Sequence, residues 1–217
     1  MTRDELINAV KVKLEEFSPF EGISGSGLQV ETNSAYAEDS IRPIHTYIDR
    51  TLDETADEVL LTVPLERIFS SQTVKDLGSV TIGSDLVGTL SVPNDYLRLY
   101  EFKMTSWSKK VTMPITPLGN PVAYQDQQNP YLRGKQIYPV LALNNRTFEV
   151  YSAASSSDTV ETAKYVAHTA AENVQADLQQ FIVVLCAAKV LEIFNRAQDA
   201  QVFRNEYASM ITNRLNK

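Results

Sequence analysis

Cysteine and histidine are nearly absent from this chain of 217 residues. The single cysteine, Cys186, excludes an intramolecular disulfide and any structural zinc site with two or more cysteine ligands. The two histidines, His45 and His168, each have one carboxylate four residues further on, at Asp49 and Glu172. One such pair supplies too few ligands for a metal ion, so we expect both histidines to serve as surface or packing residues.

Recognisable catalytic motifs are also missing. The sequence has no Gly-x-Ser-x-Gly elbow, no Walker loop, no His-Glu-x-x-His motif and no dinucleotide glycine fingerprint. The glycines at positions 22, 25 and 27 are irregularly spaced, which argues against a loop that cradles phosphate. The sequence therefore predicts a protein that is not an enzyme and that uses no catalytic residue, metal or cofactor.

No hydrophobic run is long enough to cross a bilayer. The longest, residues 181–194, contains Lys189 and Glu192 and falls short of the roughly 20 residues that a spanning helix needs. The first residues enter an amphipathic pattern without the apolar core of a signal peptide. We expect a protein without membrane attachment that is not exported by the general secretory route.

Basic residues are too few to balance the acidic ones. The chain has 20 Lys and Arg against 27 Asp and Glu, a net charge of -7, which argues against a protein that binds nucleic acid by neutralising phosphates. Asp53, Glu54, Asp57 and Glu58 form two i,i+4 acidic pairs on adjoining faces of an expected helix. A solvated helix face is the default interpretation, and an acidic channel or interface surface is the alternative.

Hydrophobic spacing predicts an α+β fold in which helical N- and C-terminal segments pack together and an antiparallel β region is inserted between them. Helical periodicity covers residues 3–17 and 40–61, and an apolar face continues from 178 to 215 with a potential break at 195–199. Either one long helix or two stacked helices fits that last pattern. We expect one structural domain over 1–217, with a helical body at 1–64 and 177–217 and a β-rich insertion at 78–168.

Within the insertion, alternation of apolar and polar residues predicts several strands. One hairpin is expected from 96–104 and 109–115, and a second from 137–143 and 147–152 around Asn-Asn-Arg at 144–146. A further strand is expected at 159–166. Residues 21–39 and 119–133 are rich in Gly, Asn, Gln and Pro, so we expect a surface loop and a long polar excursion there.

Aromatic and basic residues gather in the β-rich third, where Lys109, Lys110 and Lys135 accompany several tyrosines. This composition fits packing within strands, a subunit interface, or ligand binding by stacking. The interface candidates are Arg98, Trp107, Tyr124, Tyr131, Arg133 and Tyr138.

Two stretches carry a pattern found elsewhere: residues 92–98, Val-Pro-Asn-Asp-Tyr-Leu-Arg, and residues 131–139, Tyr-Leu-Arg-Gly-Lys-Gln-Ile-Tyr-Pro. The first is similar to the Leu-Pro-x-x-(aromatic or Leu)-Leu-Arg strand start of head-to-tail adaptors. On the basis of these two stretches and the order of the expected elements, the chain resembles the head-to-tail adaptor, or connector ring, proteins of tailed bacteriophages. It is similar to tail tubular A proteins and to the ring proteins of crAss-like phages.

This resemblance implies a virion structural protein, made in the bacterial host cytoplasm and located at the portal vertex and tail. It implies a ring of identical subunits, a dodecamer that matches the portal, bound to the portal protein and to a neighbouring tail or ring protein. DNA would pass through the ring without sequence-specific binding. The alternative is a tail-associated carbohydrate or receptor binding module that uses Trp107 and the tyrosines.

Overall fold

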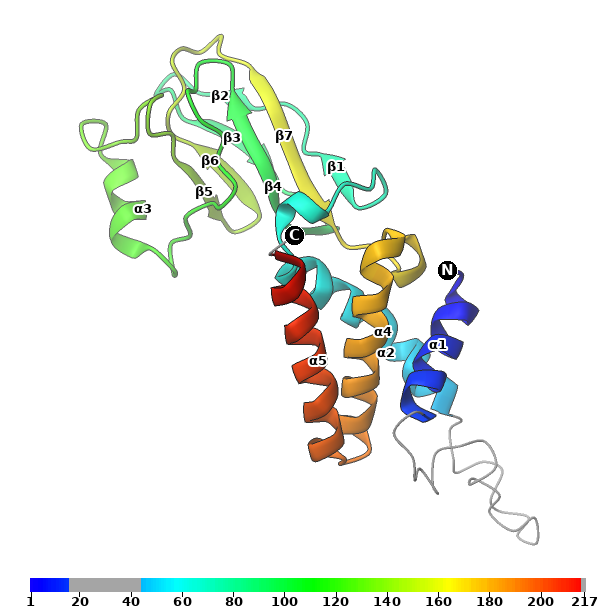
Figure 1. Ribbon diagram of the computed structural model, residues 1–217. Coiled ribbons are helices and arrows are strands. Elements are labelled where there is room, and N and C mark those ends of the chain that lie inside the picture. The colour runs from blue at the N-terminus through cyan, green and yellow to red at the C-terminus, as the bar shows by residue number, and fades with distance from the viewer. Residues whose placement is uncertain (16–43, 216–217) are drawn as a thin grey trace, which may run out of the picture. The chain divides into compact units, whose positions relative to one another are not determined.

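The computed structural model describes residues 1–15 and 44–215 and confirms the α+β prediction (Figure 1). The chain divides into two compact units: a helical unit, Met1–Ser70 with Thr169–Lys217, and a β unit, Ser71–His168. The β unit begins before the predicted insertion because the short strand β1 (Val74–Asp76), which the sequence patterns did not indicate, pairs with β7. The expectation of one structural domain over the whole chain stays a prediction.

The helical unit is built around one almost wholly apolar helix. Its elements are α1 (Arg3–Glu15), α2 (Ile44–Thr62), the short helices η1 (Leu65–Arg67) and η2 (Ala171–Asn173), α4 (Ala176–Ile193) and α5 (Ala197–Leu215). Every residue of α4 from 181 to 188 is buried, and α1, α2 and α5 all pack against this helix. A helix that is apolar on all sides is stable only when neighbours cover it, so α4 forms the centre of this unit.

The first helix begins as the sequence predicts. The Oγ1 of Thr2 accepts a hydrogen bond from the Glu5 N–H at 3.3 Å, and the Glu5 carboxylate accepts one from the Thr2 N–H at 2.7 Å. This reciprocal capping box satisfies two amides at the start of the helix. The expected helix residues 16–17 and 40–43, and the expected loop 21–39, lie outside the described residues.

Two helices, and not one, make up the C-terminal apolar segment. Asn195 has a positive φ of 57°, and the Arg196 N–H donates back to the Leu191 carbonyl while the Asn195 N–H donates to that of Glu192. This is the Schellman pattern, which ends a helix in a left-handed residue where Asn is favoured after Gly. The polar residues at the predicted break therefore end α4, and three residues separate it from the start of α5.

The β unit contains two antiparallel sheets. Its remaining strands are β2 (Thr81–Ile82), β3 (Gly88–Ser91), β4 (Tyr96–Met104), β5 (Leu141–Asn144), β6 (Thr147–Val150) and β7 (Val160–Ala167). One sheet has the order β1-β7-β4 and the other β2-β3-β6-β5. Phe102 of the first sheet and Phe148 of the second belong to one buried apolar cluster, so the two sheets share a core.

One predicted hairpin is confirmed and the other is wrong. Strands β5 and β6 pair around Asn145 and Arg146, whose φ values of 45° and 70° fit a two-residue type I′ turn. In contrast, residues 109–115 form no second strand beside β4, and only Val111 bridges to Phe102. Pro114 has no N–H to extend that ladder, and the next residue, Ile115, pairs instead with β5 of the other sheet.

The expected polar excursion at 119–133 is wrong in part, because it contains the helix α3 (Pro121–Gln128). Pro121 occupies the first helical turn, where a missing N–H costs nothing and the fixed φ of proline suits the helix. Gln127 is the buried residue of this helix. The sequence did not predict α3, because its Gln- and Asn-rich composition has no apolar periodicity.

Residues 92–98, on which the resemblance partly rests, form the corner between β3 and β4. The Asp95 carboxylate accepts hydrogen bonds from Lys75 Nζ at 2.6 Å and from the Tyr165 hydroxyl at 2.9 Å. Arg146 donates to the Pro93 carbonyl and to the Asn94 side chain, both at 2.9 Å. The Pro-Asn-Asp sequence thus fixes the path of the chain from one sheet to the other.

Candidate assembly surface

Large hydrophobic side chains are exposed to solvent along residues 109–138, here called the 109–138 segment. Leu118 is 98% exposed, Tyr131 91% and Tyr138 74%, and four further side chains are at least 60% exposed: Met113, Val122, Leu132 and Ile137. Elsewhere in residues 1–15 and 44–212, only Val12 and Phe69 among the large hydrophobic side chains are more than half exposed. Concentrated apolar exposure of this kind is typical of contact surfaces.

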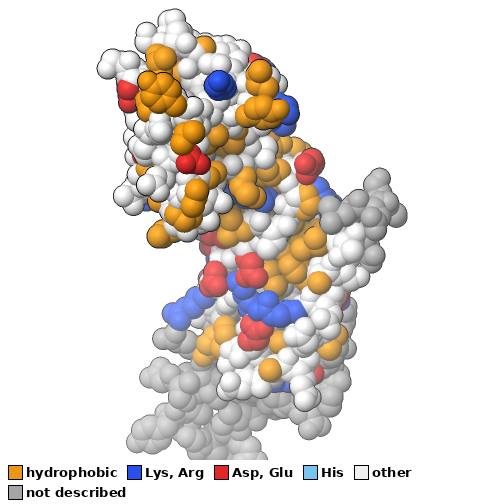
Figure 2. Space-filling view, turned by 90° about the vertical axis from the view of Figure 1, so that its left-hand side faces the viewer, with side chains coloured by type: hydrophobic (Ala, Val, Ile, Leu, Met, Phe, Trp, Pro, Cys, Tyr) orange, Lys and Arg blue, Asp and Glu red, His pale blue; other side chains and the backbone are white. Residues whose placement is uncertain are grey.

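Figure 2 turns the α3 side of the β unit toward the viewer. On this face the β unit carries several hydrophobic groups among polar ones, with a few separate basic and acidic side chains. By the area of an average aromatic side chain, Tyr131 and Tyr138 alone leave roughly 250 to 400 Å² uncovered. A protein–protein interface of standard size buries about 800 Å² of each partner. The exposed side chains of the whole segment are therefore enough to supply most of one side of such an interface.

Hydrogen bonds to Glu149 hold α3 against the sheet. The Glu149 carboxylate accepts hydrogen bonds from the Tyr124 hydroxyl at 3.3 Å, from the Asn144 amide at 3.1 Å and from the Tyr151 hydroxyl. Burial raises the pKa of both tyrosines, and the nearby Glu149 charge raises it further. Both hydroxyls therefore remain protonated donors. The Glu149 carboxylate on β6 thus binds α3 through Tyr124 and β5 through Asn144.

A second set of contacts fixes the chain after α3. The Gln127 side chain accepts a hydrogen bond from the Gly134 N–H at 2.8 Å and donates to the Ala123 carbonyl at 3.1 Å. Arg133 donates to the carbonyls of Gln127 and Asp85, and its guanidinium lies 5.5 Å from the centre of the Tyr151 ring. The exposed side chains consequently stand on a backbone that is already ordered, which lowers the entropic cost of binding.

Trp107 anchors the start of the segment. Its indole is 3% exposed, packs against Phe102 with ring centres 5.4 Å apart, and donates from Nε1 to the Ser152 carbonyl at 2.9 Å. Next to it, Ser108 bonds the Gln136 carbonyl. This burial makes Trp107 a core residue of the β unit whose indole face is already covered.

The other five interface candidates are placed differently. Tyr131 and Tyr138 are exposed in the 109–138 segment, Tyr124 and Arg133 are half-buried there and hold it in place, and Arg98 is half-buried on β4, outside the segment. Sequence reasoning did not single out Met113, Leu118, Val122, Leu132 and Ile137. Met113 and Ile137 fall within strands that the sequence predicted, and Leu118, Val122 and Leu132 are isolated apolar residues in a stretch without strand or helix periodicity.

The charge of the segment is opposite to that of the chain. The segment contains Lys109, Lys110, Arg133 and Lys135 but one acidic residue, Asp126, whereas the chain has a net charge of -7. The Lys109 ammonium lies 5.6 Å from the centre of the Tyr138 ring, so positive charge borders the exposed aromatics. A basic and apolar surface of this composition is suited to an acidic partner.

Three of the four acidic channel candidates take part in two separate ion-pair sites on α2. Asp53 pairs with Arg3 at 3.0 Å and accepts a hydrogen bond from the Ala171 N–H at 3.0 Å. Glu54 and Glu58 pair with Lys189 of α4 at 3.0 and 2.7 Å. Burial lowers the pKa of Lys189, but its bonds to Glu58 and Glu54 outweigh that effect and the pKa is raised. Asp57 is half-buried.

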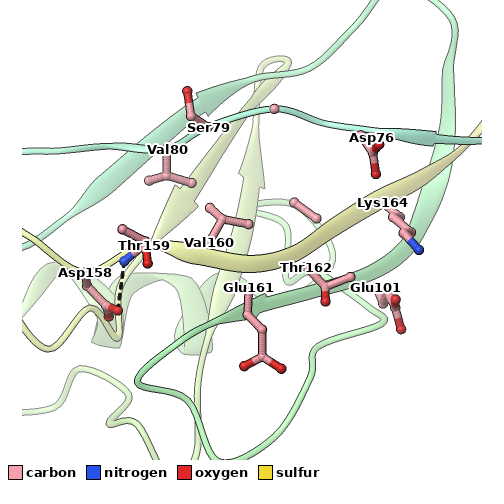
Figure 3. A pocket seen from close by; sticks show the side chains of 12 residues that line it. Asp76, Ser79, Val80, Glu101, Asp158, Thr159, Val160, Glu161, Thr162 and Lys164 are labelled. Carbon is pink, nitrogen blue, oxygen red and sulfur yellow. Dashed lines mark hydrogen bonds between the residues drawn. The ribbon is translucent and has the colours of Figure 1, made fainter.

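A shallow hollow of about 560 Å³ lies beside β7, between that strand and residues 76–80 (Figure 3). Three of the four carboxylates that line it have partners: Asp158 accepts from Thr105, Ser106 and two backbone amides, Glu161 pairs with Lys103, and Glu101 with Lys110. Among the residues that the structure describes, no three His, Cys, Asp or Glu side chains gather as metal ligands, and His45 and His168 are both exposed. These three paired carboxylates stabilise turns and strands.

A scan of the chain against models of protein families finds no match, and a search of curated proteins finds none. Within the described residues, none of the helices has the length and apolarity required to span a membrane. The functional assignment therefore rests on the 109–138 segment and its setting.

Proposed function

We propose that this protein is a virion structural protein, a subunit of a head-to-tail connector ring that joins portal to tail around the DNA channel. The 109–138 segment carries the proposal, because it holds seven exposed apolar side chains on a backbone fixed by partly buried hydrogen bonds. An ordered apolar surface of this kind is costly in a protein that works alone and useful in one that is always bound to neighbours.

The two stretches that resemble connector proteins have distinct places in this proposal. Residues 92–98 form the corner that joins the two sheets, and residues 131–139 supply Tyr131, Leu132, Ile137 and Tyr138 to the segment. The first stretch would keep the β unit in shape, and the second would contact the portal, a tail protein or another subunit.

The net charge supports a channel through which DNA moves freely. A chain with a net charge of -7 repels phosphate in the absence of local basic grooves, so passing DNA would not be retained. On α2, Glu54 is the acidic side chain best placed to contribute, because its side chain is 78% exposed.

Electron microscopy of the purified protein mixed with the portal of the same phage tests the proposal. We expect a closed ring, dodecameric like the portal, stacked coaxially on it. Protein that stays monomeric and ignores the portal, or virions whose portal-proximal tail lacks the protein, would contradict it.

The alternative function, a tail-associated carbohydrate or receptor binding module, now depends on Tyr131 and Tyr138, which are exposed aromatic rings near Lys109. Stacking on a sugar would use these two rings, since Trp107 is buried. Glycan binding by the isolated protein, lost in Tyr131→Ala and Tyr138→Ala without loss of fold, would favour this module over the connector.

A further inference from the structure

The helical unit offers a surface whose chemistry is complementary to the 109–138 segment. Its described residues include nine basic and fourteen acidic side chains, whereas the β unit has nine basic and eight acidic. The excess of negative charge therefore lies in the helical unit, and the local excess of positive charge lies in the 109–138 segment.

One face of α2 combines this negative charge with apolar surface. Glu54, Asp57, Glu58 and Leu61 follow the i, i+3, i+4 and i+7 spacing that brings side chains to one side of a helix. The Glu54 side chain is 78% exposed and Leu61 is 47% exposed. Because Lys189 of the adjacent α4 pairs with Glu54 and Glu58, this face continues onto α4, where Ile193 is 49% exposed.

We infer that the 109–138 segment of one copy docks on this α2 face of a second copy, an inference that rests on the proposed function. Exposed apolar side chains of the segment would cover Leu61 and Ile193, while Lys109, Lys110 and Lys135 would approach Glu54 and its acidic neighbours. Opposite potentials would fix the register of the contact and exclude pairing of like faces.

This contact is heterologous, because the two faces that meet are different. Each copy then has one free segment and one free α2 face, so addition of further copies closes into a ring or extends as a filament. A like-to-like contact would stop at a dimer. The proposal thus predicts the growth pattern of the assembly as well as its surfaces.

Mixing two defective variants tests the contact directly. In one, Tyr131→Ser with Ile137→Ser removes two exposed side chains of the segment. In the other, Glu54→Lys with Leu61→Ser alters the α2 face, and Lys189 keeps its partner Glu58. Masses would be measured by analytical ultracentrifugation of the full chain over a concentration series, with thermal melts to show that both variants are folded.

We expect the wild-type mass to grow beyond a dimer with concentration, and the Kd of self-association to rise ten-fold or more in each variant alone. An equimolar mixture should form heterodimers and stop there, because only one intact pair of faces remains. Val12→Ser, an exposed valine on α1, is the matched control and should associate like wild type.

Any of three results would overturn the inference: a wild-type protein that stays monomeric, a mixture that stays monomeric, or a defective variant that associates as the wild type does. The proposed function has a separate readout: a protein that fails here and still forms a ring on the portal refutes the docking faces and leaves the connector in place.

Cysteine cross-linking gives a second measurement, since the only native thiol, Cys186, is buried. On oxidation, a chain with both Tyr138→Cys and Glu54→Cys should give a ladder of oligomers, and each single variant should stay uncross-linked. A dimer from Tyr138→Cys alone would show that like faces meet and would overturn the inference.

Discussion

The helical unit and the β unit place their apolar side chains differently. In the helical unit the most apolar stretch, residues 181–188 of α4, is entirely buried under three other helices. In the β unit seven large apolar side chains lie exposed within the 109–138 segment, while Phe102, Trp107 and Phe148 belong to a separate core. Burial in the first unit serves stability, and we propose that ordered exposure in the second serves contact with another molecule.

The largest effect on stability is expected in the centre of the helical unit. Phe181→Ala should lower the free energy of unfolding by about 3 to 5 kcal/mol, because the ring is fully buried and meets Tyr207 edge-on at 6.1 Å. Urea denaturation followed by circular dichroism measures it. Ile193→Ala on the same helix is the control, since that side chain is 49% exposed and should cost much less. Equal losses would mean that α4 is not the centre of the unit.

An intermediate effect is expected where the β unit fixes its exposed segment. Glu149→Ala leaves the Tyr124 and Tyr151 hydroxyls without their acceptor and should cost about 1 to 3 kcal/mol. Hydrogen exchange of residues 121–128 should accelerate more than that of β5 and β6. In Glu161→Ala, which removes only an exposed ion pair with Lys103, exchange in α3 should not change. Unaltered protection of α3 in the Glu149 variant would show that other contacts hold the helix.

A smaller effect concerns pH and the corner at 92–98. The hydrogen bond from Lys75 lowers the pKa of Asp95 below its usual 3.8; burial opposes this, and the Tyr165 hydroxyl adds to the lowering. The unfolded chain then binds the proton more readily, so the contribution of Asp95 is present above about pH 4 and is lost as the pH falls through its folded pKa. Urea titrations from about pH 5 to pH 2 should show a shallower loss of stability in Asp95→Asn than in wild type. Identical slopes would contradict the role of this carboxylate.

The smallest effect on stability should come from the exposed segment itself. Tyr131→Ser should change the free energy of unfolding by no more than about 0.5 kcal/mol, because the ring is 91% exposed. The thermal midpoint of the isolated protein should therefore stay near that of wild type. A large decrease would mean that Tyr131 packs within its own chain, and the contrast between the two units would fail.

Much of the fold could be predicted because its signals are local. The Thr2 and Glu5 capping box, the apolar run of α4 and the turn at Asn145 and Arg146 depend on residues close in sequence. The pairing of residues 109–115 could not be predicted this way, because it depends on which distant strand lies beside the chain after Pro114. The candidate surface was harder still to predict from sequence. Tyr131 and Tyr138 were identified by composition, but Trp107 has the same composition signal and is buried. Exposure is a property of the tertiary structure, and isolated apolar residues such as Leu118 have no periodicity that reports it.

Hydroxyl-radical footprinting of the protein, isolated and within intact virions, tests most directly whether the 109–138 segment is the assembly surface. Met113, Tyr131 and Tyr138 react readily when exposed, and all three are exposed in the chain. The account predicts strong oxidation of these residues in the isolated protein, at a concentration low enough to keep it monomeric, and clear protection in the virion. Equal oxidation in both states, with protection confined to other parts of the chain, would contradict it.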